Sequence, residues 1–280
     1  MSGAAGLVYQ VAWQRILALH SGVGIYSVAM IVGSFMAGLG LGSHLGGRLT
    51  LRRSPRAALR AFGLLELAIG LFGLGSGWLY YDFLYLQLGG LYASPWRAGL
   101  LHFLALLPPT ALMGMTLPFL ARAMVRDLSS AGRTIGLLYG LNILGAGVGA
   151  FLTPWVLIRY YGIRGALVAA ALGNAAAGLT ALALSLRRGL EAAGDEEPLP
   201  SAAEAVAGAD GAPLRLWTLL YALSGFCALS LEILWFRMLE LAVKSSAFTF
   251  GTLLCLYLLG NAAGCVIAVA RGRFAHPLRA

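Results

Sequence analysis

The sequence contains little charge. Its 280 residues include 20 Lys and Arg and 11 Asp and Glu, so charged residues make up 11% of the chain, about half the share of a soluble domain. Hydrophobic residues make up 59%, and the mean hydropathy is +0.81. This composition excludes an ordinary soluble enzyme and predicts an integral membrane protein. The net charge of +9 does not indicate nucleic-acid binding, because Lys and Arg lie mostly in short loops between apolar runs.

Cysteine is also scarce. Cys227, Cys255 and Cys265 all lie in apolar runs without the spacing of metal ligands, so we assign them to packing and predict neither a metal site nor a cofactor. The opening run has no basic start and no small-residue cleavage site. We therefore expect no cleavable signal peptide.

Long apolar runs fill most of the chain. Each is about 20 residues or more, which is enough for a helix to cross the hydrocarbon core of a bilayer. The fold class that follows is an all-α polytopic membrane protein with about eight transmembrane helices. The predicted spans are 3–21, 24–46, 59–81, 98–122, 134–158, 164–186, 216–242 and 246–270.

Arginine is concentrated in the loops after the even-numbered spans. The loop after the second span holds Arg48, Arg52, Arg53 and Arg56, and further arginines follow the fourth, sixth and eighth spans. The positive-inside rule then places both termini in the cytoplasm. Arg159 and Arg164, which lie in an odd-numbered loop, weaken this asymmetry.

One stretch of the chain occurs twice. Residues 224–241, SGFCALSLEILWFRMLEL, align without a gap with residues 2–19, SGAAGLVYQVAWQRILAL. The register continues into the next apolar run. The matched pairs are Ser2/Ser224, Gly3/Gly225, Leu7/Leu229, Trp13/Trp235, Arg15/Arg237, Leu17/Leu239, Leu19/Leu241, Gly38/Gly260 and Gly42/Gly264, and Gln10 stands opposite Glu232. We interpret this as an internal repeat.

The repeat defines the predicted domain organisation. Residues 1–186 form a first six-helix unit, and 216–270 form the first two helices of a second copy. Between them lies a linker, 187–215, rich in Ala, Gly, Pro and acidic residues, which we expect to be cytoplasmic and disordered. Residues 271–280 form a cytoplasmic tail. A period of six helices gives both copies the same orientation, as in the six-plus-six plan of the major facilitator transporters.

Several motifs together resemble the membrane part of the fused transmembrane spermidine synthase-like proteins of bacteria. The resemblance covers nearly all of residues 2–186 and again 216–273. Its motifs are SGAAGLVYQVAWQR, FMAGLGLGSHLGGRL, LLELAIGLFGL, LLPPTALMGMTLPFLARA and LYGLNILGAGVGAFL. The resemblance implies a bacterial inner membrane location. It also implies a soluble aminopropyltransferase-like domain after the membrane helices.

This chain contains no catalytic element of that kind. Its glycines lie in apolar runs without a flanking strand and acid, and the linker 187–215 is too short for a domain. We therefore predict no catalytic residues, and transferase activity would need a domain outside this chain. The expected partners are the lipid bilayer and either other membrane subunits or a soluble synthase-like domain, with no nucleic acid.

Polar residues within the apolar runs are the candidate site, because they are costly to place in lipid. The candidates are Gln10, Arg15, Glu66, Asn142, Glu232 and Arg237. We expect Glu66 to pair with Arg15, and Glu232 to find Arg15 or Gln10 across the two copies. The alternative for Arg15 and Arg237 is an interfacial anchor formed with Trp13 and Trp235.

Two functions of different classes remain open from the sequence. The first is a membrane domain of a spermidine synthase-like protein that anchors it and binds or passes a small cation such as a polyamine. The second is a non-catalytic structural subunit of a larger membrane complex. Under the first, Glu66 and Glu232 would bind ammonium groups.

Overall fold

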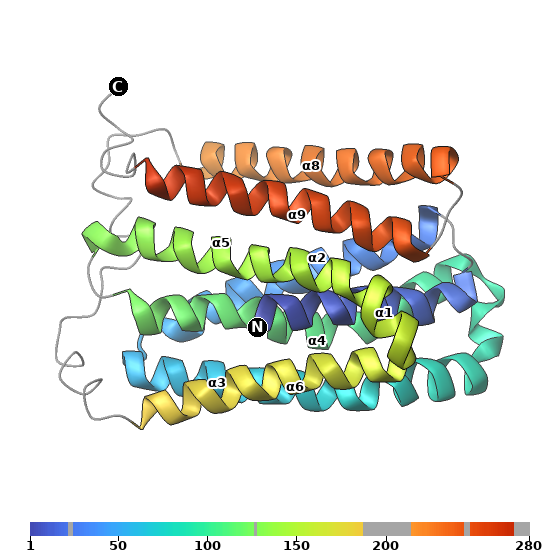
Figure 1. The fold of residues 1–280 in the computed structure, drawn as a ribbon, viewed down its shortest axis with the longest axis horizontal. Coiled ribbons are helices and arrows are strands. Elements are labelled where there is room, and N and C mark those ends of the chain that lie inside the picture. The colour runs from blue at the N-terminus through green and yellow to red at the C-terminus, as the bar shows by residue number, and fades with distance from the viewer. Residues whose placement is uncertain (22–24, 126–127, 187–213, 244–246, 272–280) are drawn as a thin grey trace.

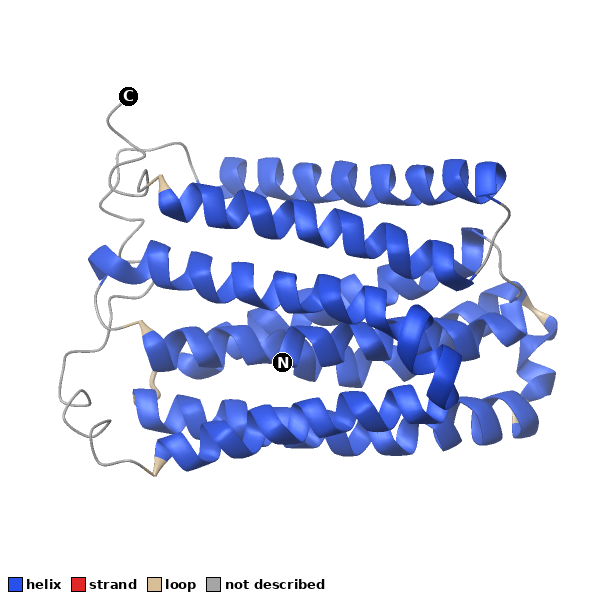
Figure 2. Ribbon diagram, viewed as in Figure 1, coloured by secondary structure: helices blue, strands red, loops and turns tan. Residues whose placement is uncertain are grey.

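The computed structural model describes residues 1–21, 25–125, 128–186, 214–243 and 247–271. Within these ranges the chain is helical and forms no β-strand (Figure 2), which confirms the predicted all-α class. The α-helices are α1 (Ser2–Ser21), α2 (Ile25–Thr50), α3 (Pro55–Gly77), α4 (Pro95–Met124), α5 (Leu128–Leu152), α6 (Arg159–Ser185), α8 (Leu214–Val243) and α9 (Ala247–Ala270). The predicted linker and tail lie outside the described residues, except that Leu214 and Arg215 begin α8 and Arg271 follows α9.

Three helical segments have other geometries. The π-helix η1 (Trp78–Gln87) continues α3, the 3₁₀ helix η2 (Gly89–Ala93) precedes α4, and the π-helix η3 (Thr153–Ile158) joins α5 to α6.

The long helices lie side by side along one axis (Figure 1). α2 packs along α4, α3 along α6, and α5 along α9, while α1 contacts both α5 and α6. α8 lies at the edge of the bundle beside α9, far from α3 and α6 (Figure 1). Phe236 is the one buried side chain among those described in α8, so this helix contributes little to the core.

Within the described ranges, six helical stretches are long and apolar enough to cross a membrane. They are Ala29–Thr50, Pro55–Gln87, Trp96–Met124, Ala131–Ser185, Arg215–Leu239 and Phe248–Ala270. α1 is not among them, because Gln10, Gln14 and Arg15 lower its hydropathy. The eight-span count stays a prediction.

The 55-residue stretch Ala131–Ser185 reverses direction at Gly162. Gly162 has φ of +69°, a left-handed conformation that glycine adopts without steric cost. On one side of it Gly149 packs against Ala4, and on the other Gly173 packs near Ala5. α5 and α6 therefore run in opposite directions, and both pack along α1 (Figure 1).

Glycines at four-residue spacing bring these helices into close contact. A side chain at Gly38 or Gly42 of α2 would collide with Thr110 or Ala111 of α4. In α5, Gly136 and Gly140 face α9, whereas Gly145 and Gly149 face α1. The glycine rows are thus helix-packing surfaces, as small residues generally are in membrane bundles.

Three prolines lie inside α4 without interrupting it. Proline ordinarily kinks or breaks a helix, but α4 runs unbroken from Pro95 to Met124 through Pro108, Pro109 and Pro118. Pro109 has no N–H to donate to the carbonyl of Ala105. The Tyr80 hydroxyl of η1 donates to that carbonyl instead, at 3.0 Å. A side chain from a neighbouring segment therefore satisfies the group that proline leaves free, as membrane helices with internal proline require.

Replacing Tyr80 with phenylalanine should reveal this compensation. Tyr80 is fully buried, so the variant leaves a buried carbonyl without a donor and should lose about 1–3 kcal/mol of unfolding free energy. Chemical denaturation of the purified protein measures the loss. Tyr81→Phe is the matched control, because Tyr81 is 41% exposed. Equal stability of the Tyr80 variant and the control would contradict the assignment.

Candidate functional site

The candidate site lies where α1, α3 and α6 meet. Two contacts show that α1 and α3 run in the same direction. Tyr9 packs on Gly73, and one turn further along, the Trp13 indole N–H donates to the Ser76 hydroxyl at 2.8 Å. Glycine at position 73 leaves room for the Tyr9 ring, since a Cβ there would overlap it.

α6 closes the third side of the site. Gly63 of α3 packs against Gly178 of α6, and Gly70 packs against Asn174. Glu66 lies one turn from each of these two glycines, and residues three and four apart share a helix face. Glu66 is therefore directed into the α3–α6 interface at the level of Asn174.

Glu66 is completely buried, and neither of its carboxylate oxygens has a hydrogen-bond partner. The Tyr9 hydroxyl and Asn174 Oδ1 are also buried without a partner. Ser2 offers a side-chain donor to the Glu66 carboxylate, but its geometry falls short of a hydrogen bond, and Tyr9 and the amino group of Met1 lie within electrostatic range of it. We call Glu66, Tyr9 and Asn174 the acidic cluster.

Oxygen dominates the acidic cluster. The carboxylate and the amide oxygen only accept hydrogen bonds, while the tyrosine hydroxyl can also donate one. Buried polar atoms without partners are rare in native structures and require an explanation. A ligand with several N–H donors and a positive charge, such as a primary ammonium group, matches the set. A metal site is not indicated, since no group of His, Cys, Asp or Glu in the described ranges could hold an ion.

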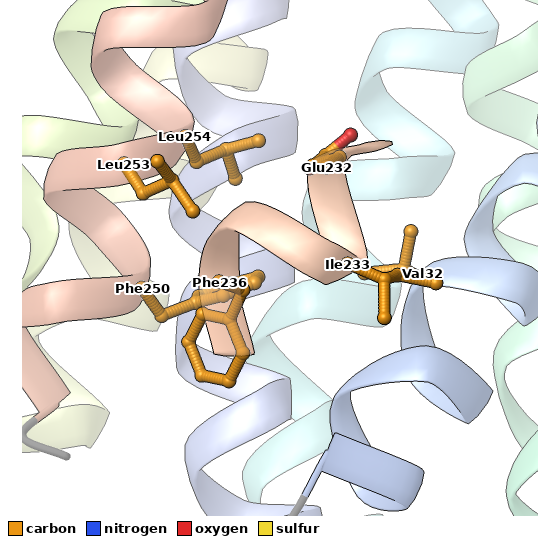
Figure 3. A pocket seen from close by; sticks show the side chains of 7 residues that line it. All are labelled: Val32, Glu232, Ile233, Phe236, Phe250, Leu253 and Leu254. Carbon is orange, nitrogen blue, oxygen red and sulfur yellow. The ribbon is translucent and has the colours of Figure 1, made fainter. Parts of the chain in front are cut away.

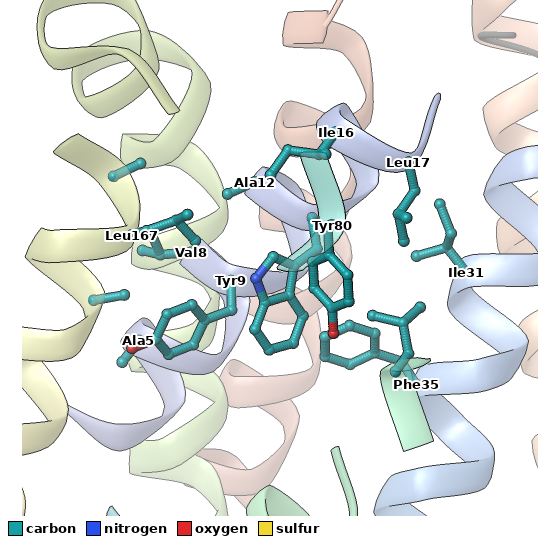
Figure 4. Close-up of a cluster of buried hydrophobic side chains, with 14 of the residues drawn as sticks. Ala5, Val8, Tyr9, Ala12, Ile16, Leu17, Ile31, Phe35, Tyr80 and Leu167 are labelled. Atoms are coloured by element: carbon teal, nitrogen blue, oxygen red, sulfur yellow. The ribbon is translucent and has the colours of Figure 1, made fainter. Parts of the chain in front are cut away.

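An aromatic cluster lies next to the acidic cluster. The Trp13 ring stacks on Tyr9 at 5.1 Å between centroids and meets Tyr80 edge-on at 5.6 Å. Phe35 and Phe72 complete the surroundings, each 5.9 Å from Trp13. Figure 4 shows Tyr9, Tyr80 and Phe35 converging from three segments. Trp13 is fully buried, so the interpretation of Trp13 as an interfacial anchor is wrong.

The predicted pairing of Glu66 with Arg15 is also wrong. Arg15 is exposed and lines a separate cavity with Arg159, while the Glu66 oxygens have no partner. The two residues lie at opposite ends of the α1–α3 contact: Glu66 interacts with Ser2, 13 residues or about 20 Å along a helix from Arg15. Both residues need a partner because each carries a charge, but nothing in the sequence specifies their relative positions along the bundle.

The other predicted residues lie apart from the acidic cluster. Gln10 is buried in α1, and Asn142 is exposed on α5, where its backbone packs against Gly3. Arg237 is exposed on α8. Of the six candidates, only Glu66 therefore belongs to the acidic cluster.

Glu232 borders a small hollow between α2, α8 and α9 (Figure 3). The hollow has a volume of about 10 Å³, close to the minimum for one water molecule. All its other lining residues are apolar, and they include neither Arg15 nor Gln10. They are Val32, Ile233, Phe236, Phe250, Leu253 and Leu254.

Tyr9 and Asn174 of the acidic cluster are not among the six candidates, and Tyr9 was the harder of the two to recognise. A tyrosine in an apolar run is ordinarily an amphipathic core residue, so it carried no signal by itself. Its spacing of seven residues from Ser2 places both on one face of α1. That spacing becomes informative only once α3 is known to pack there.

Comparison with known proteins gives partial matches to one kind of enzyme. The chain is 32% identical over 192 residues to a polyamine aminopropyltransferase of Mycobacterium tuberculosis, a match that covers 65% of this chain and 34% of that protein. A Mycobacterium bovis protein of the same name matches equally. A Corynebacterium efficiens protein of that name is 26% identical over 176 residues, covering 63% of this chain and 32% of its own length.

The chain thus spans about a third of the length of the curated relatives it matches. No protein-family model and no solved structure matches it. These relatives support the resemblance to spermidine synthase-like proteins that the motifs indicate, as a distant homology.

Proposed function

We propose that this chain is the membrane-embedded part of a protein related to the polyamine aminopropyltransferases. In this proposal it anchors that protein in the bacterial inner membrane and binds a small organic cation, such as a polyamine, at the acidic cluster. The observation that carries the proposal is Glu66, fully buried with both carboxylate oxygens unpartnered. Buried acids in membrane helices are costly and mark ligand or ion sites.

Arginines at one end of the bundle support the proposed orientation. Arg56 donates to the Ser185 carbonyl at 2.7 Å, and Arg122 donates to the Arg53 carbonyl at 3.0 Å. These bonds hold the ends of α3, α4 and α6 together at the end where the arginine-rich loops lie. The proposal places this end in the cytoplasm.

The proposed second copy of the repeat accounts for the exposure of α8. Trp13 is fully buried among α1 and its neighbours, but the matching Trp235 is 61% exposed. Likewise Gly38 and Gly42 face α4, while the matching Gly260 and Gly264 have no neighbour within 4 Å among the described residues. In the proposal, α8 and α9 begin a second bundle of the major facilitator type, and aminopropyl transfer belongs to a domain outside this chain.

A binding experiment with Glu66→Gln tests the cation site. Loss of one buried negative charge should weaken binding of labelled spermidine to the purified chain at least tenfold, equivalent to about 1.4 kcal/mol. The matched control is Asp82→Asn, which removes an acid of η1 outside the acidic cluster. Glu232→Gln, measured in parallel, tests the second predicted acid. Unchanged spermidine affinity of Glu66→Gln would reject the site.

The second candidate function is that of a structural subunit in a larger membrane complex. The observation in its favour is the exposure of α8. Among its described side chains, only Phe236 is buried. Purification in mild detergent separates the two functions. A stoichiometric complex with other membrane subunits, whose stability does not respond to spermidine, would favour the structural role.

A further inference from the structure

A second cavity lies between α1, α9 and the η3–α6 junction. Its volume is about 220 Å³, against the roughly 10–15 Å³ that one water molecule needs on the same measure. Two arginines, Arg15 and Arg159, line it together with Gln14, and its lining contains no Asp or Glu. The cavity is therefore positively charged and large enough for a ligand.

The polar side chains approach the cavity from two elements. Gln14 and Arg15 are neighbours on α1, and Arg159 is the first residue of α6. Gln14 is only 7% exposed, so its side chain is largely shielded from the outside of the bundle, and it borders the cavity. The Arg159 guanidinium lies over the Tyr160 ring, 5.6 Å from its centroid, which restricts its position.

Two guanidinium groups on one cavity repel each other unless an anion lies between them. Guanidinium is planar and donates in pairs, and this geometry fits phosphate oxygens better than a spherical anion. The Gln14 amide can donate a further hydrogen bond. The polar part of the cavity thus suits a phosphate group.

The remaining wall of the cavity is apolar. Val11, Ile158 and Phe248 come from α1, η3 and α9. Arg15 lies six residues before the end of α1, or about 9 Å along the helix, and its long side chain can extend towards that end. A phosphate that carries an apolar chain would satisfy both parts of the lining.

We propose that this cavity binds the phosphate group of an anionic amphiphile, held by Arg15, Arg159 and Gln14 with its apolar part against Val11, Ile158 and Phe248. This site is separate from the acidic cluster, takes a ligand of opposite charge, and does not depend on the proposed polyamine function. The phosphate can come from a membrane lipid or from a free phosphate compound.

Native mass spectrometry of the full chain tests the proposal with defined lipids. We expect the protein to retain phosphatidylglycerol in preference to phosphatidylcholine, and Arg15→Gln/Arg159→Gln to reduce phosphatidylglycerol retention at least tenfold. Arg164→Gln is the matched control, because Arg164 is exposed in α6 and does not line the cavity. Arg15→Lys/Arg159→Lys keeps the charge but loses paired donation, so retention should fall to an intermediate level.

A second measurement distinguishes the source of the phosphate. Thermal unfolding is recorded with inorganic phosphate against chloride at equal ionic strength. Stabilisation that the double glutamine variant abolishes, without selective lipid retention, would assign the site to a free phosphate compound. Absence of both effects in a wild-type protein that elutes as one folded species would overturn the proposal. So would an equal loss of lipid in Arg164→Gln, because it would show that general positive charge suffices.

Discussion

Replacing Trp13 with alanine should destabilise the bundle by about 3–5 kcal/mol, as is typical when a large aromatic side chain is removed from a core. Trp13 is fully buried, contacts four aromatic rings and donates a hydrogen bond to Ser76. Exposing apolar surface to lipid costs little free energy, because lipid tails are themselves apolar. Most of the loss should therefore come from the cavity, the ring contacts and the lost hydrogen bond to Ser76, whose hydroxyl still donates to the Gly73 carbonyl. Titration with SDS, followed by circular dichroism, measures the change.

Trp235 provides a control within the same chain. It occupies the matching position of the predicted repeat, with an arginine two residues after each tryptophan, but it is 61% exposed. Trp235→Ala should change the unfolding free energy by no more than about 0.5 kcal/mol. Similar losses for the two alanine variants would contradict the packing described for α1 and α8.

Replacing Glu66 with leucine should stabilise the protein when no ligand is present. A buried carboxyl without hydrogen bonds lowers stability, whether it is neutral or charged. Leucine fills a similar volume with no polar group, so the unfolding free energy should rise by about 1–3 kcal/mol. The same SDS titration measures it. A stabilising substitution at a polar position indicates that the polar residue is kept for function.

Spermidine should reverse the order of the two proteins. A ligand at 1,000 times its dissociation constant stabilises the wild type by about 4.1 kcal/mol, more than the advantage expected for leucine, whereas the leucine variant gains nothing. A loss of stability in Glu66→Leu without ligand would show instead that Glu66 has a structural partner, with Ser2 the first to examine. This outcome would leave the membrane assignment intact and remove the cation site.

The helices could be predicted from the sequence because apolar runs of membrane length are separated by short basic or glycine-containing loops. Each predicted span overlaps one long helix, and boundaries differ by up to six residues, as at the start of α5 and the end of η1. The continuity of α4 through its prolines could not be predicted. One of the carbonyls that the prolines leave free, that of Ala105, accepts from the Tyr80 hydroxyl, which comes from a segment 25 residues earlier in the chain.

The candidate site was predicted only through Glu66. An isolated acid in an apolar helix is visible in any sequence. Its neighbours depend on which helices pack together and on how those helices are shifted relative to one another along the bundle axis. The parallel register of α1 and α3, fixed by Tyr9 on Gly73 and Trp13 on Ser76, brings Tyr9 towards Glu66 and leaves Arg15 at the other end. Nothing local to either helix specifies that register.

Tyr80 joins two parts of the molecule through one side chain. Its ring touches Trp13 and its oxygen holds the carbonyl that Pro109 leaves free in α4. Proline makes this part of α4 the easiest point of the helix to flex. A change in the bend of α4 at this point must either move the Tyr80 ring against Trp13 or break the hydrogen bond to the Ala105 carbonyl. Tyr80 thus links the proline-containing part of α4 to the buried aromatic cluster around Trp13.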